Sequence, residues 1–206
     1  MKRLLNALLI AFCLLWCWNA WAACPGTPPT SNFLGNTDTA SPSDRGITNA
    51  NGSRFTPDVT GTLNVVCAYL PFDFGSTNVR TAVYANTTTG CAGGAPNCPG
   101  AKLEESTSAA AATTAGWYST SYSGATTLTA GTYYWLKEWT DSNQMDGGST
   151  GSAANQTQIN ATSTYPSWPA TDINDFNGDY TMIIYGEITP AGGGGGRNNM
   201  LTLGVR

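Results

Sequence analysis

The stretch Ala125–Asp141, ATTLTAGTYYWLKEWTD, decides the fold of this chain. A short β-prone segment, Thr126–Leu128, leads to a tight turn at Ala130-Gly131. Residues rich in aromatic and β-branched side chains then follow until Asp141 ends the run. This order of a short strand, a tight turn and a long apolar strand is typical of an antiparallel β-sandwich.

The long strand of this stretch has two different faces, because side chains alternate with a period of two along a strand. One face carries Tyr133, Trp135, Lys137 and Trp139, and the other carries Tyr134, Leu136 and Glu138. Each face begins apolar and ends charged. We therefore expect the first half of the strand to cross a core and the second half to emerge into water.

The amino terminus has the features of a secretory signal peptide. A basic start, Met1–Arg3, precedes the apolar run Leu4–Leu15, which is too short to span a bilayer comfortably, and Ala20-Trp21-Ala22 supplies an Ala-x-Ala cleavage site. We predict a signal peptide over residues 1–22. Cys24 also permits lipoprotein processing, but the tryptophan of the cleavage site stands where a small aliphatic residue is usual, so general cleavage is favoured.

Composition places the remaining chain outside the cytosol, either secreted, on the cell surface or in the periplasm. Removal of the signal leaves about 183 residues, which suffice for one all-β domain. Without Lys2 and Arg3, seven basic residues face 13 acidic ones, a net charge of −6. This acidic balance argues against nucleic acid or anionic membrane as a partner. No second apolar stretch of spanning length is present, so we expect no transmembrane segment in the mature chain.

Four cysteines follow the predicted cleavage site, and an even number in an exported chain indicates disulfide bonds. Cys91 and Cys98 bracket a short flexible loop and are expected to pair, which leaves Cys24 to pair with Cys67. Zinc is the alternative, but the spacing is not Cys-x-x-Cys and the chain has no histidine.

The strand pattern predicts an all-β antiparallel sandwich in a single domain. We assign residues 23–46 to an extended leader rich in Pro, Thr and Ser that contains a short edge strand at Ser31–Gly35, residues 47–189 to the sandwich, and residues 190–206 to a Gly-rich linker and tail. The expected strands, besides the stretch above, are Gly61–Leu70, Asn78–Ala85, Ala101–Thr107, Gly116–Tyr122 and Gly178–Ile188.

The order of these features resembles a widespread secreted jelly-roll module. The segments that carry the resemblance are Gly61-Thr62-Leu63, Val79–Tyr84, Pro99–Ser106, Ala115-Gly116-Trp117, Leu128–Leu136 and Tyr180–Ile188. The resemblance covers residues 47–188 and departs from the pattern at Lys102 and in the cysteine-closed loop. Such modules occur in exported bacterial, archaeal and phage-associated proteins, often attached to glycan-active or adhesive chains. The resemblance therefore implies a jelly-roll-like arrangement of the sandwich, and it does not specify a ligand.

The absence of histidine excludes several catalytic classes, among them the Ser-His-Asp triad and the Cys-His nucleophile. A glycosidase needs only two carboxylates. The adjacent Glu104 and Glu105 point to opposite faces of a strand and are expected to be solvated. Glu138 and Glu187 each end an apolar strand face and could approach one another, although emergence into solvent explains them equally well.

The segment Asp172–Asp179 gathers oxygen ligands in a glycine-containing loop, which suggests a structural calcium ion held by Asp172, Asp175 and Asp179. The spacing is not that of an EF-hand, because Phe176 stands where an oxygen donor is needed. Asn and Asp also favour turns for their own sake, so a simple turn is the alternative.

Aromatic residues outside the strand interiors are the best candidates for a binding site. Trp117, Trp139, Tyr165 and Trp168 lie at strand ends or on loops, where a ring can stack on a ligand. The long polar segment Ser142–Asn160 could complete a binding rim. Asp141 and Asp172 are the expected hydrogen-bond acceptors, and packing over the sandwich end is the alternative role for each ring.

We therefore expect a non-catalytic secreted binding module that recognises a glycan or a cell-surface partner through these aromatic side chains. The alternative is a structural subunit of a virion, appendage or surface layer, which would associate with further copies through its sheet edges. A carboxylate-dependent enzyme that cleaves polysaccharides is the third reading.

Overall fold

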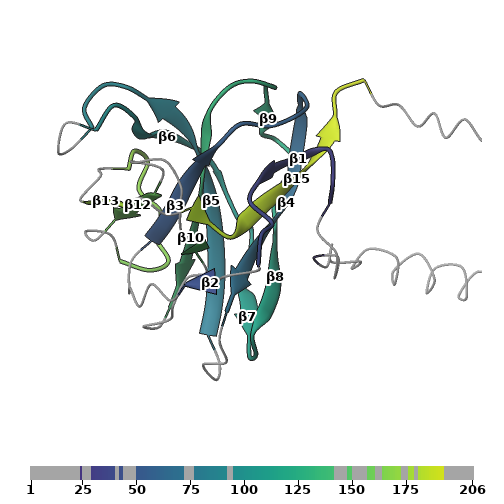
Figure 1. The fold of residues 1–206 in the computed structure, drawn as a ribbon, viewed down its shortest axis with the longest axis vertical. Helices are drawn as coiled ribbons and strands as arrows, with labels where there is room; N and C mark the ends of the chain where they lie inside the picture. The colour runs from purple at the N-terminus through teal and green to yellow at the C-terminus, as the bar shows by residue number, and fades with distance from the viewer. Residues whose placement is uncertain are drawn as a thin grey trace, which may run out of the picture.

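The computed structural model describes residues 24, 29–39, 42–43, 50–71, 77–91, 95–141, 148–149, 157–160, 164–172, 176–178 and 181–192. The described part of the chain is all-β, and its strands pair antiparallel throughout. Two sheets pack against each other as a sandwich (Figure 1).

One sheet has five strands, built around the apolar strand β4. Its order is β1 (Phe33–Gly35), β15 (Ile184–Pro190), β4 (Gly61–Leu70) and β8 (Gly116–Ser121), with β9 (Thr127–Leu128) paired to the start of β4. β4 lies between β15 and β8 because its side chains are apolar on both faces, as the sequence predicts for a central strand.

The other sheet has seven strands and contains β10, the long strand of the stretch Ala125–Asp141. Its order is β13 (Phe176–Gly178), β12 (Thr157–Asn160), β3 (Ala50–Phe55), β10 (Tyr134–Thr140), β5 (Thr77–Thr87) and β6 (Cys98–Glu105), with β7 (Ala110–Ala112) paired to β5. A small third sheet joins β14 (Thr181–Met182), β11 (Gly148–Ser149) and β2 (Pro42–Ser43).

The strand order confirms a jelly-roll topology. Eight strands form the frame, and in chain order they are β1, β3, β4, β5, β6, β8, β10 and β15. The first, eighth, third and sixth of them are neighbours in one sheet, and the second, seventh, fourth and fifth are neighbours in the other. This alternation between two four-stranded layers is the jelly-roll arrangement of two Greek keys.

The main core lies between the two sheets. The five-stranded sheet contributes Leu34, Leu63, Val66, Ala68, Leu70 and Ile184, and the seven-stranded sheet contributes Val79, Val83, Tyr134 and Leu136. Two smaller apolar clusters lie on the outer faces, one on each sheet. The outer cluster on the seven-stranded sheet bears directly on the candidate site.

The stretch Ala125–Asp141 forms β9, a turn and β10, as predicted. Gly131 adopts a φ of +78° in that turn, a conformation that glycine tolerates without steric cost. The expectation that the second half of β10 emerges into water is wrong, because Lys137 is 1% exposed and Glu138 is 0% exposed. β10 lies between β3 and β5, and both of its faces are covered along its whole length.

Both predicted disulfide bonds are present, Cys24–Cys67 and Cys91–Cys98. They indicate an oxidising compartment. Because the Cys24 sulfur is bonded to Cys67, it is not available for the thioether of a lipoprotein. Within the described ranges, no helix has the length and apolarity that a membrane crossing requires.

The amino-terminal strand β1 extends the sandwich into the segment that the sequence analysis assigned to a leader. β1 pairs with β15, and Leu34 is fully buried in the main core. The predicted signal peptide and the tail after Gly192 lie outside the described residues.

Candidate binding surface

Residues 164–172, here called the cover segment, lie across the outer face of the seven-stranded sheet. Its backbone is bonded to β6: the Lys102 amide donates to the Ala170 carbonyl at 2.8 Å, and the Asp172 amide donates to the Gly100 carbonyl at 3.4 Å. Ala101 and Thr171 form a β-bridge between the two segments. The cover segment is thus held as an irregular extra strand along the β6 edge.

Side chains also hold the cover segment to the sheet. The Tyr84 hydroxyl donates to the Pro169 carbonyl at 2.9 Å, and Lys102 Nζ donates to the Trp168 carbonyl at 3.1 Å. Burial, together with the nearby carboxylates of Asp172 and Glu105, raises the pKa of the Tyr84 hydroxyl. Tyr84 therefore stays protonated and acts as a donor at any physiological pH.

Three of the predicted binding aromatics meet between the cover segment and β10. Trp139 makes edge contacts with Tyr165, at a centroid distance of 5.7 Å, and with Trp168, at 5.3 Å. Trp139 is only 1% exposed and Trp168 only 6%, so neither ring has a face free to stack on a ligand. Tyr165 is half-buried, and burial followed by the charge of Asp141 raises the pKa of its hydroxyl.

A buried ion pair lies beside this cluster. Lys137 Nζ, on β10, contacts Asp172 Oδ2 at the end of the cover segment, and both side chains are 1% exposed. In register, Lys137 stands between Gly52 on β3 and Ala82 on β5. A β-carbon at Gly52 would lie 2.4 Å from Cγ of Lys137, so the glycine makes room for the lysine stem.

Asp141, a predicted ligand acceptor, instead caps the start of β5. It accepts hydrogen bonds from the Asn78 amide at 2.8 Å, from Asn78 Nδ2 at 2.6 Å and from Thr77 Oγ1 at 2.9 Å. Partial burial raises the pKa of Asp141, but these hydrogen bonds outweigh it and hold the pKa below its usual value. Asp141 is therefore an ionised structural acceptor.

Trp117 lies apart from the other predicted aromatics, on the outer face of the five-stranded sheet. It packs against Tyr185, at a centroid distance of 4.9 Å, and against Tyr69, at 5.2 Å. A pocket of about 430 Å³ adjoins it, lined also by Cys24 and Tyr118. Trp117 therefore cannot share one ligand with the residues of the cover segment.

The predicted calcium ligands cannot be assembled from the described residues. Asp172 is tied to Lys137, whereas Asp175 and Asp179 lie outside the described part of the chain. Among the residues that the structure does describe, no group of three or more His, Cys, Asp or Glu side chains could hold a metal ion.

Glu138 and Glu187 do not form a carboxylate pair. Glu138 shares the inner face of β10 with Leu136, which lies in the main core between the sheets. Glu187 shares the outer face of β15 with Tyr185, and burial raises its pKa above the usual value. The five-stranded sheet separates the two carboxyl groups, so they cannot act together on one glycosidic bond.

A groove that the sequence analysis missed lies beside Tyr133, at the start of β10. Tyr133 is 49% exposed and Leu103, on β6, is 41% exposed, and both line a pocket of about 550 Å³. The guanidinium carbon of Arg54 lies 4.4 Å from the centroid of the Tyr133 ring. The sequence places Tyr133 in the half of the strand that is expected to cross a core, yet Tyr133 precedes the first buried residue of β10 by one position.

The lining of the Tyr133 groove is uncharged among the described residues. Polar groups come from Asn86, Thr127 and Thr132. The Asn86 side chain is already oriented, because its Oδ1 accepts from Trp135 Nε1 at 3.0 Å and its Nδ2 donates to Asn97 Oδ1 at 3.0 Å. The groove thus combines an oriented amide, two hydroxyls and an exposed ring.

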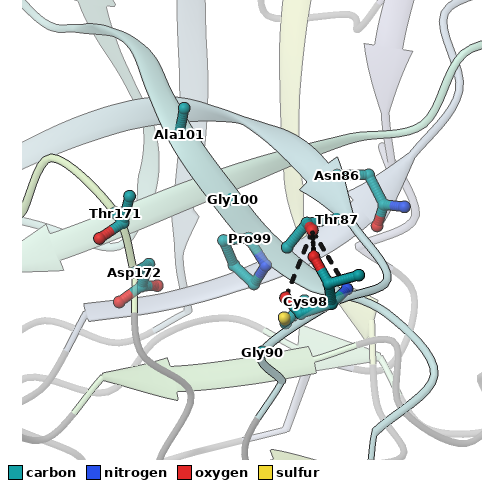
Figure 2. A pocket seen from close by; sticks show the side chains of 10 residues that line it. Asn86, Thr87, Gly90, Cys98, Pro99, Gly100, Ala101, Thr171 and Asp172 are labelled. Atoms are coloured by element: carbon teal, nitrogen blue, oxygen red, sulfur yellow. Dashed lines mark hydrogen bonds between the residues drawn. The ribbon is translucent and has the colours of Figure 1, made fainter.

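Asn86 also borders a second pocket of about 350 Å³. Figure 2 shows Thr171 and Asp172 of the cover segment on one side of this pocket and Thr87 and Cys98 on the other. Cys98 lines this second pocket, so the Cys91–Cys98 disulfide bond stabilises its wall.

A comparison with protein-family models finds no match for this chain, and neither does a comparison with curated protein sequences. The geometry described above is therefore the basis for its functional interpretation.

Proposed function

We propose that the protein is a non-catalytic binding module that recognises a glycan in the groove beside Tyr133. The observation that carries this proposal is the pair of exposed large apolar side chains, Tyr133 and Leu103, which line one pocket of about 550 Å³. A binding partner that covers such side chains removes apolar surface from water, which favours binding by about 25 cal/mol per Å².

The chemistry of the groove suits a sugar ring. A pyranose has an apolar C–H face, which packs on an aromatic ring, and a rim of hydroxyls, which need hydrogen-bond partners. Tyr133 supplies the ring, and Asn86, Thr127 and Thr132 supply polar groups around it. A volume of a few hundred cubic ångströms is sufficient for a mono- or disaccharide.

Arg54 supports Tyr133 in this role. Its guanidinium lies over the ring and holds the ring by a cation–π contact. A ring that is already oriented loses less conformational entropy when it binds a ligand. The module would act by binding alone, because the described lining of the groove contains no carboxylate that could serve as acid or nucleophile.

The test is binding of the purified full chain to a broad glycan array, followed by titration calorimetry with the best ligand. Tyr133→Ala is expected to lower the affinity at least about tenfold, because a central aromatic contact is commonly worth more than 1.4 kcal/mol. Tyr69→Ala is the matched control, since Tyr69 is a half-buried tyrosine on the outer face of the opposite sheet, and it should leave the affinity unchanged.

Tyr165→Ala locates the site. If it abolished binding while Tyr133→Ala did not, the glycan would bind at the cover segment, as the sequence predicted, and the Tyr133 groove would be the wrong surface. A chain that bound no glycan of the array, but self-associated with rising concentration through the Tyr133–Leu103 surface, would favour the structural-subunit alternative.

A further inference from the structure

Lys137 and Asp172 offer a reactive pair that the binding function does not use. The amine nitrogen of Lys137 contacts a carboxyl oxygen of Asp172, and the two residues are 35 positions apart in the chain. One belongs to the central strand β10 and the other to the cover segment, so a bond between them would join the segment to the sheet.

The pair is sealed from solvent. Each side chain is 1% exposed, and on the same face of β10 the flanking residues Trp135 and Trp139 belong to an outer apolar cluster with Tyr84 and Trp168. An ion pair in such surroundings pays a large desolvation penalty, whereas a neutral amide does not.

The lysine stem is also held in position. Gly52 and Ala82, the neighbours of Lys137 in register, are the two smallest side-chain types, and the stem runs against the Gly52 backbone. A nucleophile fixed in contact with its target reacts at an effective concentration far above any free solute, on the order of 10⁵ M or more in well-oriented cases.

We propose that Lys137 and Asp172 condense into an intramolecular amide bond. One proton first moves from the Lys137 ammonium to the Asp172 carboxylate, which gives a neutral amine and a neutral acid. The amine lone pair then attacks Cγ of Asp172, a nitrogen proton moves to the hydroxyl oxygen, and the C–O bond breaks. The C–N bond is formed, one water molecule leaves, and no oxidant, reductant or other reactant is consumed.

A second lysine–carboxylate pair in the same sheet provides an internal control. Lys102 Nζ lies 2.6 Å from Glu105 Oε2, but these side chains are 25% and 37% exposed. Water can hydrate both of these charges, so the charged pair remains the stable form and no amide is expected there.

The decisive measurement is the intact mass of the full chain, produced in an oxidising compartment and then denatured. With the predicted signal peptide removed and both disulfide bonds counted, the mass should be lower by one water molecule than the remaining sequence requires. Proteolysis followed by tandem mass spectrometry should yield a branched peptide that joins the β10 segment to the segment containing Asp172. A wild-type protein of full mass that yields no branched peptide would overturn the proposal.

Variants separate the amide from a simple ion pair. Lys137→Arg keeps the positive charge but cannot condense, and Asp172→Ala removes the carboxyl group, so both should show full mass and a linear peptide map. Lys102→Arg should keep the loss of one water. A loss of water that persisted in Lys137→Arg would place the modification elsewhere and would also overturn the assignment. The wild-type mass and peptide map decide the matter even if a variant does not fold.

Discussion

At the scale of single residues, Glu104 illustrates how a surface carboxylate can stabilise a loop. It was expected to be solvated, yet it accepts hydrogen bonds from the amide and hydroxyl of Ser123, both at 2.6 Å, and from the Thr126 amide at 3.1 Å. Partial burial raises its pKa, but these bonds outweigh the burial and lower the pKa below the usual value. Glu104 thereby fixes the turn between β8 and β9.

The lowered pKa of Glu104 predicts a loss of stability in acid. Its contribution is fully present above the ordinary glutamate pKa of about 4.3 and is lost as the pH falls through the lower folded-state value. Urea unfolding between pH 7 and pH 3 should show this loss. Glu104→Gln should lower the free energy of unfolding by about 1 kcal/mol at pH 7 and weaken the dependence on acid pH.

Glu187 is the control for this experiment, because burial raises its pKa. Its charged form is disfavoured in the folded state, so its stabilising contribution is present at low pH and disappears as the pH rises through the raised value. Glu187→Gln should therefore leave the stability at pH 7 unchanged or slightly higher. An acid loss that was the same in wild type and Glu104→Gln would contradict the role assigned to Glu104.

At the scale of elements, the cover segment and β10 depend on each other. The segment buries Trp135, Lys137 and Trp139 of the strand, and the strand in turn anchors Trp168 and Asp172 of the segment. Without the segment, the central strand of the larger sheet would expose two tryptophans and a lysine stem. This mutual burial explains why β10 has a lysine at its centre and is nevertheless fully buried.

Removal of the Trp168 ring should loosen the cover segment. Trp168→Ala is expected to cost about 3 kcal/mol of folding free energy and to speed hydrogen exchange at the amides of Lys102 and Asp172. Trp117→Ala, on the outer face of the other sheet, should leave exchange at these two amides unchanged. Equal protection in wild type and Trp168→Ala would show that the backbone bonds to β6 hold the segment without the ring.

The two disulfide bonds should differ in their contribution to stability. Cys24–Cys67 links positions 43 residues apart and Cys91–Cys98 positions 7 apart. By loop-closure entropy, replacing both cysteines with alanine should cost about 4 kcal/mol for the first bond and about 2.5 kcal/mol for the second. Denaturant unfolding of the two double variants checks the order, and a larger loss from the short loop would contradict it.

The sequence predicted the strands well and the surface poorly, for a physical reason. Alternation along Gly61–Leu70 and Tyr134–Thr140 depends on local chemistry, so the strand positions could be inferred. The short spacing of Cys91 and Cys98 indicated one disulfide bond, and the two remaining cysteines gave the other. The cover segment acts between parts of the chain that are far apart in sequence, and no local pattern indicates that it buries Lys137. Tyr133 was misjudged because strand periodicity does not show where the first buried residue of a strand lies.

At the scale of the whole molecule, both disulfides and both sheets belong to one sandwich with a shared core. The main apolar cluster contains side chains from β1, β4, β5, β10 and β15, so neither sheet can keep its inner face buried alone. The tryptophans of the outer clusters lie on the two opposite outer faces of this one sandwich, and they are Trp117, Trp135, Trp139 and Trp168.

Unfolding is therefore expected to be a single cooperative transition. Far-ultraviolet circular dichroism and tryptophan fluorescence should give coincident midpoints in urea at neutral pH with the disulfides intact. A fluorescence transition that clearly preceded the loss of β signal would show that an outer cluster opens as a separate unit.

The pairing of β1 with β15 limits how early the five-stranded sheet can form, because the chain is made from its amino terminus. β1 is made long before β15, so the five-stranded sheet cannot be completed until Ile184–Pro190 has followed. Before β15 is available, the bond between Cys24 and Cys67 can tether the amino-terminal segment to β4. β15 then pairs with β4 along one edge and with β1 along the other. Early oxidation of these two cysteines would therefore shorten the time that β1 needs to reach its place in the five-stranded sheet.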